Sequence, residues 1–157
     1  MLEKPLIGWT HVWVGDMFLG PASYIADVPV DCLDAFLNYF SINNKLGISF
    51  NLTFDAESYS FGLVQFDDCL YAIYTENVPI KLEQIDPTSL GLDKYCSSEE
   101  VILTLAKELV SDIRKYLSDW IQWDLCGDET DDDILKRKDL LEERCQRLEL
   151  LLENKKC

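Results

Sequence analysis

The apolar residues of this chain change their spacing partway along the sequence, and that change limits the folds open to it. Between Ile48 and Phe54 every second residue is apolar, which is typical of a strand with one buried face. From about residue 99 to residue 125 the spacing follows the turns of a helix instead. The apolar stripe of this long segment comprises Ile102, Leu105, Ala106, Leu109, Ile113, Tyr116, Leu117, Trp120 and Ile121. Half-buried strands followed by a one-sided helix predict layers of strands and helices.

Short runs rich in aromatic and β-branched residues, separated by turn residues, predict the strands. They cover residues 7–14, 17–28, 48–54, 59–66, 69–75 and 78–85. A short helix is expected over residues 31–40, where apolar residues recur at helical spacing. Because the connections are short, neighbouring strands should be antiparallel. The predicted fold is α+β: an antiparallel β-meander sheet of about five or six strands with a short helix, covered by a long amphipathic helix and a C-terminal helical hairpin.

Gly127, a natural residue to end a helix, divides the chain into two parts. Residues 1–127 are predicted to form an acidic α+β domain, and residues 128–157 a C-terminal helix that Thr130 and the acids after it open. The apolar seam of this helix is narrow and comprises Ile134, Leu141, Cys145, Leu148 and Leu152. It allows two arrangements: a hairpin packed on the domain, or a short coiled coil between two copies.

Negative charge is concentrated in the part of the chain that should fold as a domain. The net charge is −15, and the first 100 residues supply −11 of it, with fifteen acids against four lysines and no arginine. The apolar content is high, so this part should be compact and not a disordered tail. A surface this acidic repels nucleic acid and anionic membranes and attracts basic proteins. We therefore expect a basic protein partner, no direct binding to nucleic acid and no binding to membranes.

Signals for catalysis, cofactors and metals are weak. His11 is the single histidine, and a histidine in an aromatic strand is usually a packed or surface residue. One histidine without closely spaced cysteines does not make a zinc ligand set. The sequence contains no glycine-rich phosphate loop and no nucleophile elbow. We expect a protein that is not an enzyme and that holds no cofactor or metal.

Trp9 and Trp13 lie four positions apart on the first predicted strand and therefore share one face. If that face is solvated, the two rings form an aromatic anchor of the kind that dominates protein interfaces. If the face meets the long helix, they belong to the core, and this is the interpretation we favour.

The cysteines and the N-terminal residues bear on the compartment. The six cysteines are widely spaced and are expected to be reduced, structural residues. The N-terminal residues lack the apolar segment of a secretory signal, and no run approaches the eighteen or so apolar residues of a membrane span. These features predict a cytoplasmic protein.

The expected function is masking of a basic, nucleic-acid-handling site on a partner protein. Bacterial immunity proteins and phage-encoded inhibitors that mimic the charge of nucleic acid work in this way, and the chain resembles them in size and charge only. The candidate partner-binding residues are acids and tyrosines in or near the turns of the sheet: Asp55, Glu57, Tyr59, Asp67, Asp68, Tyr71, Tyr74 and Glu76. One alternative is a small-ligand-binding protein or hydrolase with a pocket between sheet and helices. The other is an oligomeric scaffold built through the C-terminal helix, so the protein is a monomer or a homodimer.

Overall fold

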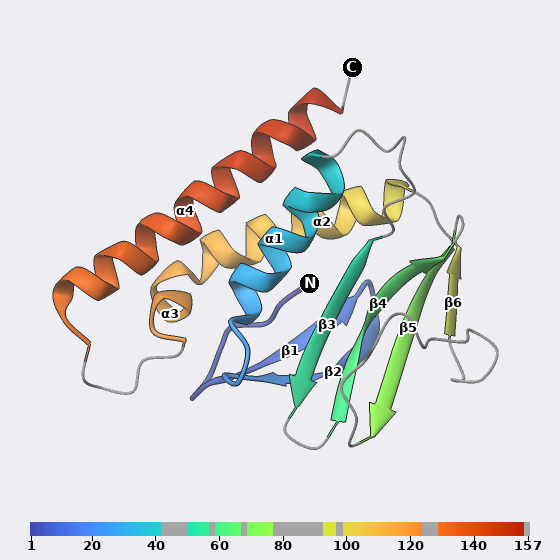
Figure 1. Ribbon diagram of the computed structural model, residues 1–157, viewed down its shortest axis with the longest axis horizontal. Coiled ribbons are helices and arrows are strands. Elements are labelled where there is room, and N and C mark those ends of the chain that lie inside the picture. Colours follow the sequence, from blue (N-terminus) through green and yellow to red (C-terminus); the bar gives the residue numbers. More distant parts are fainter. Residues whose placement is uncertain are drawn as a thin grey trace.

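Helices and strands occupy two sides of the molecule (Figure 1), and the predicted α+β class is confirmed. The computed structural model describes residues 1–41, 50–56, 59–66, 69–76, 93–96, 99–123 and 129–155. The elements are β1 (Trp9–Val14), β2 (Met17–Ser23), α1 (Val28–Ser41), β3 (Asn51–Ala56), β4 (Tyr59–Phe66), β5 (Cys69–Glu76), β6 (Asp93–Cys96), α2 (Glu99–Lys115), α3 (Leu117–Ile121) and α4 (Asp131–Asn154).

The strands form two antiparallel sheets, so the prediction of one sheet with five or six strands is wrong. Among the strands that the structure describes, β1 pairs with β2 alone, whereas β3, β4, β5 and β6 follow one another in a second sheet. The free edge of β1 is occupied by the start of the chain: the Trp13 N–H donates to the Met1 carbonyl, and the Glu3 N–H donates to the His11 carbonyl. β1 therefore has no edge left to join the larger sheet, and the β1–β2 hairpin packs across β3 and β4 instead.

The predicted strands are recovered best where they are joined by short turns. Those at 48–54, 59–66 and 69–75 correspond to β3, β4 and β5. The strand expected over 17–28 is shorter than predicted: β2 ends at Ser23, and α1 begins at Val28. β6 was not predicted, and the strand expected over 78–85 lies outside the described residues.

The long helix predicted over residues 99–125 is two helices, which corrects that prediction. α2 ends at Lys115, and Tyr116 leaves the helical conformation with φ −118° and ψ 29° before α3 begins. The break directs Trp120 and Trp123 into the core, where their rings lie 5.2 Å apart. The Trp123 indole N–H then donates to the Ala26 carbonyl at 3.0 Å, which ties α3 to the segment before α1.

Helix α4 lies diagonally across the other helices (Figure 1) and packs on α1, α2 and α3. Its seam residues Leu141, Cys145, Leu148 and Leu152 are buried in the main core. These are the residues on which the predicted coiled coil depended. In this fold they are covered by helices of the same chain.

Two of the cysteines, Cys32 and Cys145, are free and buried between the helices. Burial raises the pKa of the Cys145 thiol to about 11 and that of Cys32 well above its ordinary value. Both thiols are therefore protonated at neutral pH and act as small apolar core residues, as predicted for structural cysteines.

Candidate binding surface

The predicted partner-binding residues are distributed along the length of the larger sheet. Asp55 and Tyr59 flank the connection between β3 and β4, and Glu76 is paired with Tyr59 at the same end. The other end of β4 is Phe66, about 23 Å away at 3.3 Å per residue. Asp67 and Asp68 follow this far end in the sequence, but they and Glu57 lie outside the described residues. Of the described candidates, Tyr71 lies toward the Phe66 end, where it is paired with Val64, whereas Asp55, Tyr59 and Glu76 lie at the other end.

The two tyrosines of β5 lie on opposite faces of the sheet. Tyr74 is paired with Phe61 and is 48% exposed, whereas Tyr71 is paired with Val64 and is half-buried. Positions 71 and 74 are an odd number of residues apart, so their side chains alternate. Asp55 is exposed on the face of Tyr71 and accepts a hydrogen bond from the Ser60 hydroxyl at 2.5 Å.

A second surface, centred on Glu3, lies on the outer side of the β1–β2 hairpin. The Glu3 carboxylate accepts a hydrogen bond from the Trp13 indole N–H at 2.8 Å, and its other oxygen lies 2.9 Å from His11 Nδ1. Both partners come from the solvent-facing side of β1, because the alternate positions of this strand are buried. The backbone bond between Glu3 and His11 holds the carboxylate in place beside the strand.

A third aromatic ring packs against the two partners of this carboxylate. Phe18 is 47% exposed and lies 5.0 Å from the Trp13 ring and 5.3 Å from the His11 ring, between centroids. Trp9 and Trp13 are both partly exposed and lie outside the main core, so the favoured interpretation of them as core residues is wrong. An acid among exposed rings is suited to binding a cation, since ring faces and the carboxylate both attract positive charge.

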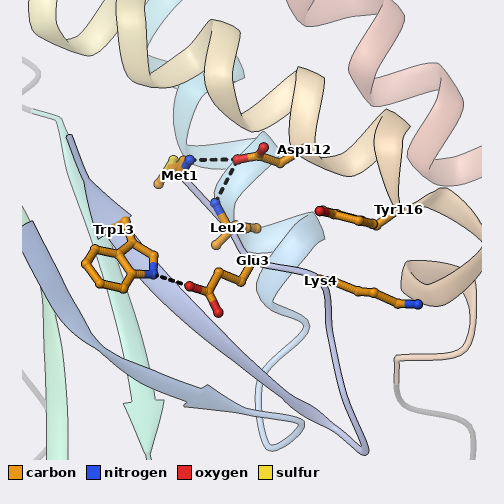
Figure 2. A pocket seen from close by; sticks show the side chains of 7 residues that line it. All are labelled: Met1, Leu2, Glu3, Lys4, Trp13, Asp112 and Tyr116. Atoms are coloured by element: carbon orange, nitrogen blue, oxygen red, sulfur yellow. Dashed lines mark hydrogen bonds and ion pairs between the residues drawn. The ribbon is translucent and has the colours of Figure 1, made fainter. Parts of the chain in front are cut away.

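A hollow of about 400 Å³ opens between the start of the chain and α2 (Figure 2). Its floor is an ion pair: the Met1 ammonium group donates to Asp112 Oδ2 at 2.6 Å, and the Leu2 N–H donates to the same oxygen at 2.9 Å. Figure 2 shows the Glu3 carboxylate turned toward Trp13 and the Lys4 side chain extending the other way. Lys4 Nζ lies 3.2 Å from Asp119, so this lysine does not neutralise Glu3.

A groove of about 520 Å³ lies on the other side of Glu3, between residues 3–7 and the outer face of β1. Leu6, Ile7 and Trp9 supply its apolar walls, and Glu3 and His11 supply polar groups. Glu3 therefore borders both hollows of this surface.

Each arginine of the chain lies beside a carboxylate of the same chain. Arg114 binds Glu149, Arg137 binds Asp27, Arg144 binds Asp34, and Arg147 lies near Glu143. Exposed carboxylates lie on several described elements: Glu3, Asp16, Asp31, Asp55, Glu100, Asp131, Asp132, Asp133, Asp139, Glu143 and Glu153. Arginine is the side chain best suited to bidentate binding of phosphate. In this protein the arginines are engaged by carboxylates of the same chain.

Among the described residues, no group of three or more His, Cys, Asp and Glu side chains is arranged to hold a metal ion. None of the described helices combines the length and the apolarity that a membrane crossing requires. No protein-family model, no curated protein and no solved structure matches this chain. Any functional conclusion therefore rests on the geometry and charge of the chain itself.

Proposed function

We propose that this chain is a non-enzymatic binding protein that masks a basic, nucleic-acid-handling site on a partner protein. The observation that carries the proposal is the acidity of the folded chain: its net charge is −15, exposed carboxylates lie on several described elements, and each arginine lies beside a carboxylate of the same chain. Two buried, reduced cysteines suit the cytoplasm, where we place the interaction.

Carboxylates on a rigid scaffold can take the positions that phosphates occupy on a basic site. Such a pairing gains a fast association rate that falls as salt rises, because long-range attraction brings the partners together. The binding regions we propose are the turns of the larger sheet and the tyrosines near them: Asp55, Glu57, Tyr59, Asp67, Asp68, Tyr71, Tyr74 and Glu76.

The test is capture followed by competition. The immobilised protein is incubated with lysate of its source cells, washed at low and then high salt, and the retained protein is identified. We expect a basic protein that is released as salt rises and whose binding to this chain competes with duplex DNA. A partner that holds both ligands at once, or no basic protein retained, would contradict the proposal.

Charge reversal then locates the binding region on the sheet. Asp55→Lys at one end, and Asp67→Lys with Asp68→Lys at the other, should slow association with the captured partner at whichever end makes contact. Asp139→Lys, on an exposed position of α4, is the matched control. An association rate constant that none of these changes alters excludes the sheet ends as the binding region.

The hollow beside Met1 and Asp112 favours a second candidate function, binding of a small ligand between the hairpin and α2. Its volume of about 400 Å³ and its facing groups, Trp13 and Tyr116, are suited to a flat polar molecule. A ligand that raises the melting temperature of the protein should lose this effect in Trp13→Ala. A stabilising ligand that Trp13→Ala still binds equally well would exclude this hollow as the site.

A further inference from the structure

The turn from Leu6 to Trp9 carries an isoleucine where the backbone disfavours one. Backbone hydrogen bonds join Leu6 and Trp9 in both directions, and the two residues between them have positive φ, 50° at Ile7 and 72° at Gly8. This is a type I′ turn, whose first central position is usually Asn, Asp or Gly. A β-branched residue there is strained, because its side chain crowds the backbone in the left-handed region.

Burial in the core does not compensate for the strain at Ile7. Ile7 is 89% exposed and Leu6 is 70% exposed, so the fold gains little apolar burial from either. Tyr24 and Ile25, exposed by 55% and 59%, follow the end of β2 at the same end of the hairpin, and the Tyr24 ring lies directly against Gly8. A strained and exposed apolar residue is best explained by contact with something outside the chain.

The groove beside this turn combines two kinds of wall. Leu6, Ile7 and Trp9 line it with apolar surface, and Glu3 and His11, whose side chains lie 2.9 Å apart, line it with polar groups. Glu3 is 51% exposed, and its carboxylate lies 2.9 Å from Nδ1 of His11, which is neutral unless protonated. An apolar passage that leads to a carboxylate matches a side chain with an aliphatic stem and a cationic head.

We propose that this groove binds a lysine or arginine side chain of the protein partner, with the stem against Ile7 and Trp9 and the cation at Glu3. The inference rests on the proposed function, since a basic partner is what supplies such a side chain, and it adds an anchoring site that lies on the hairpin and not on the larger sheet. The partly exposed Trp9 ring also lines the groove, and a cation over its face would strengthen the contact.

A second copy of the chain fits this groove less well than a basic partner. Two copies of net charge −15 repel one another. A small apolar patch also falls short of the roughly 800 Å² per partner that a stable interface buries. The Lys4 ammonium borders the groove but is held by Asp119, so it does not occupy the position proposed for the incoming cation.

The probe for this site is a hexapeptide of alternating arginine and glycine, with citrulline in place of arginine as the neutral control. Binding to the isotope-labelled full chain is followed by NMR at the indole N–H of Trp9 and Trp13 and at the backbone amides of Glu3 and Ile7. We expect the arginine peptide to shift these signals and the citrulline peptide to leave them in place. Glu3→Gln, which keeps an acceptor for Trp13, should weaken binding about tenfold.

Ile7→Asn separates binding from folding. Asparagine tolerates the left-handed conformation, so the melting temperature should stay the same or rise, while affinity for the arginine peptide falls about fivefold through loss of apolar contact. Leu150→Asn, at an exposed position of α4, is the matched control and should leave the affinity unchanged.

The outcomes distinguish this inference from the function on which it rests. Shifts that map elsewhere, equal binding of the citrulline peptide, or unchanged affinity in Ile7→Asn and Glu3→Gln would overturn the groove as a cation site. The proposed masking function would then remain supported by the captured partner and its competition with DNA, without the groove. Suppose instead that the shifts are confined to the groove and that no basic protein is captured. The groove would then be supported as a cation site, and the proposed masking function would be overturned.

Discussion

Replacing Leu148 with alanine is expected to lower the free energy of unfolding by about 3 kcal/mol. Leu148 is fully buried in the core that α4 shares with α1 and α2. The change removes apolar contacts and leaves a cavity that the tightly packed neighbours fill only in part. Urea unfolding followed by tryptophan fluorescence measures the loss, since Trp120 and Trp123 lie in the same core.

Leu150 provides the matched control for this change. It lies on the same helix but is 54% exposed, so Leu150→Ala should cost less than about 0.5 kcal/mol. Sedimentation velocity of both variants also addresses the scaffold alternative. A dimer that Leu148→Ala separates into monomers of unchanged stability would mean that this seam joins two copies, against the burial seen within one chain.

Arg137→Ala is expected to lower the free energy of unfolding by about 2–3 kcal/mol. The Arg137 side chain is only 12% exposed, and its two terminal nitrogens bind both oxygens of Asp27 at 2.7 and 2.8 Å. Its Nε also donates to the Trp120 carbonyl at 3.3 Å. Without the guanidinium, a partly buried carboxylate and a backbone carbonyl both lose a partner.

Arg147 is the control on the same helix. Its nitrogen lies 3.7 Å from a Glu143 oxygen between two largely exposed side chains, so Arg147→Ala should cost less than about 0.5 kcal/mol. In an Asp27→Asn background the effect of Arg137→Ala should shrink, because the charge that it leaves unpaired is already gone. Equal costs for the two arginines would show that burial adds nothing to the Arg137 pair.

The parts of the fold predicted from the sequence are those fixed by local pattern. The hairpins of β3, β4 and β5 follow from alternating apolar residues and short polar turns. The division into two sheets depends on the pairing of residues 1–3 with the edge of β1. The spacing of apolar residues in the sequence does not predict this pairing. The break at Tyr116 is equally hidden, because the apolar stripe continues through it while the bond from Trp123 to Ala26 requires a change of direction.

The spatial arrangement of the candidate site residues could be predicted only in part from the sequence, for a physical reason. Counting acids in turns selects charge but not its arrangement, and the odd spacing of Tyr71 and Tyr74 already placed them on opposite faces. The position of Glu3 beside His11 and Trp13 arises because the chain folds back along β1, and the sequence pattern does not indicate this contact. One signal was available: Ile7-Gly8 directly precedes a strand, where a turn of this kind normally has Asn-Gly or Asp-Gly.

The ion pairs that fasten α4 also determine when this protein can reach its native state during translation. Asp27 and Asp34 bind Arg137 and Arg144, which follow them by 110 residues. A ribosome therefore releases the acidic start of the chain long before the cations that neutralise it exist. Contacts this distant in sequence slow folding, so the newly made segment stays open to chaperones and proteases until α4 has emerged.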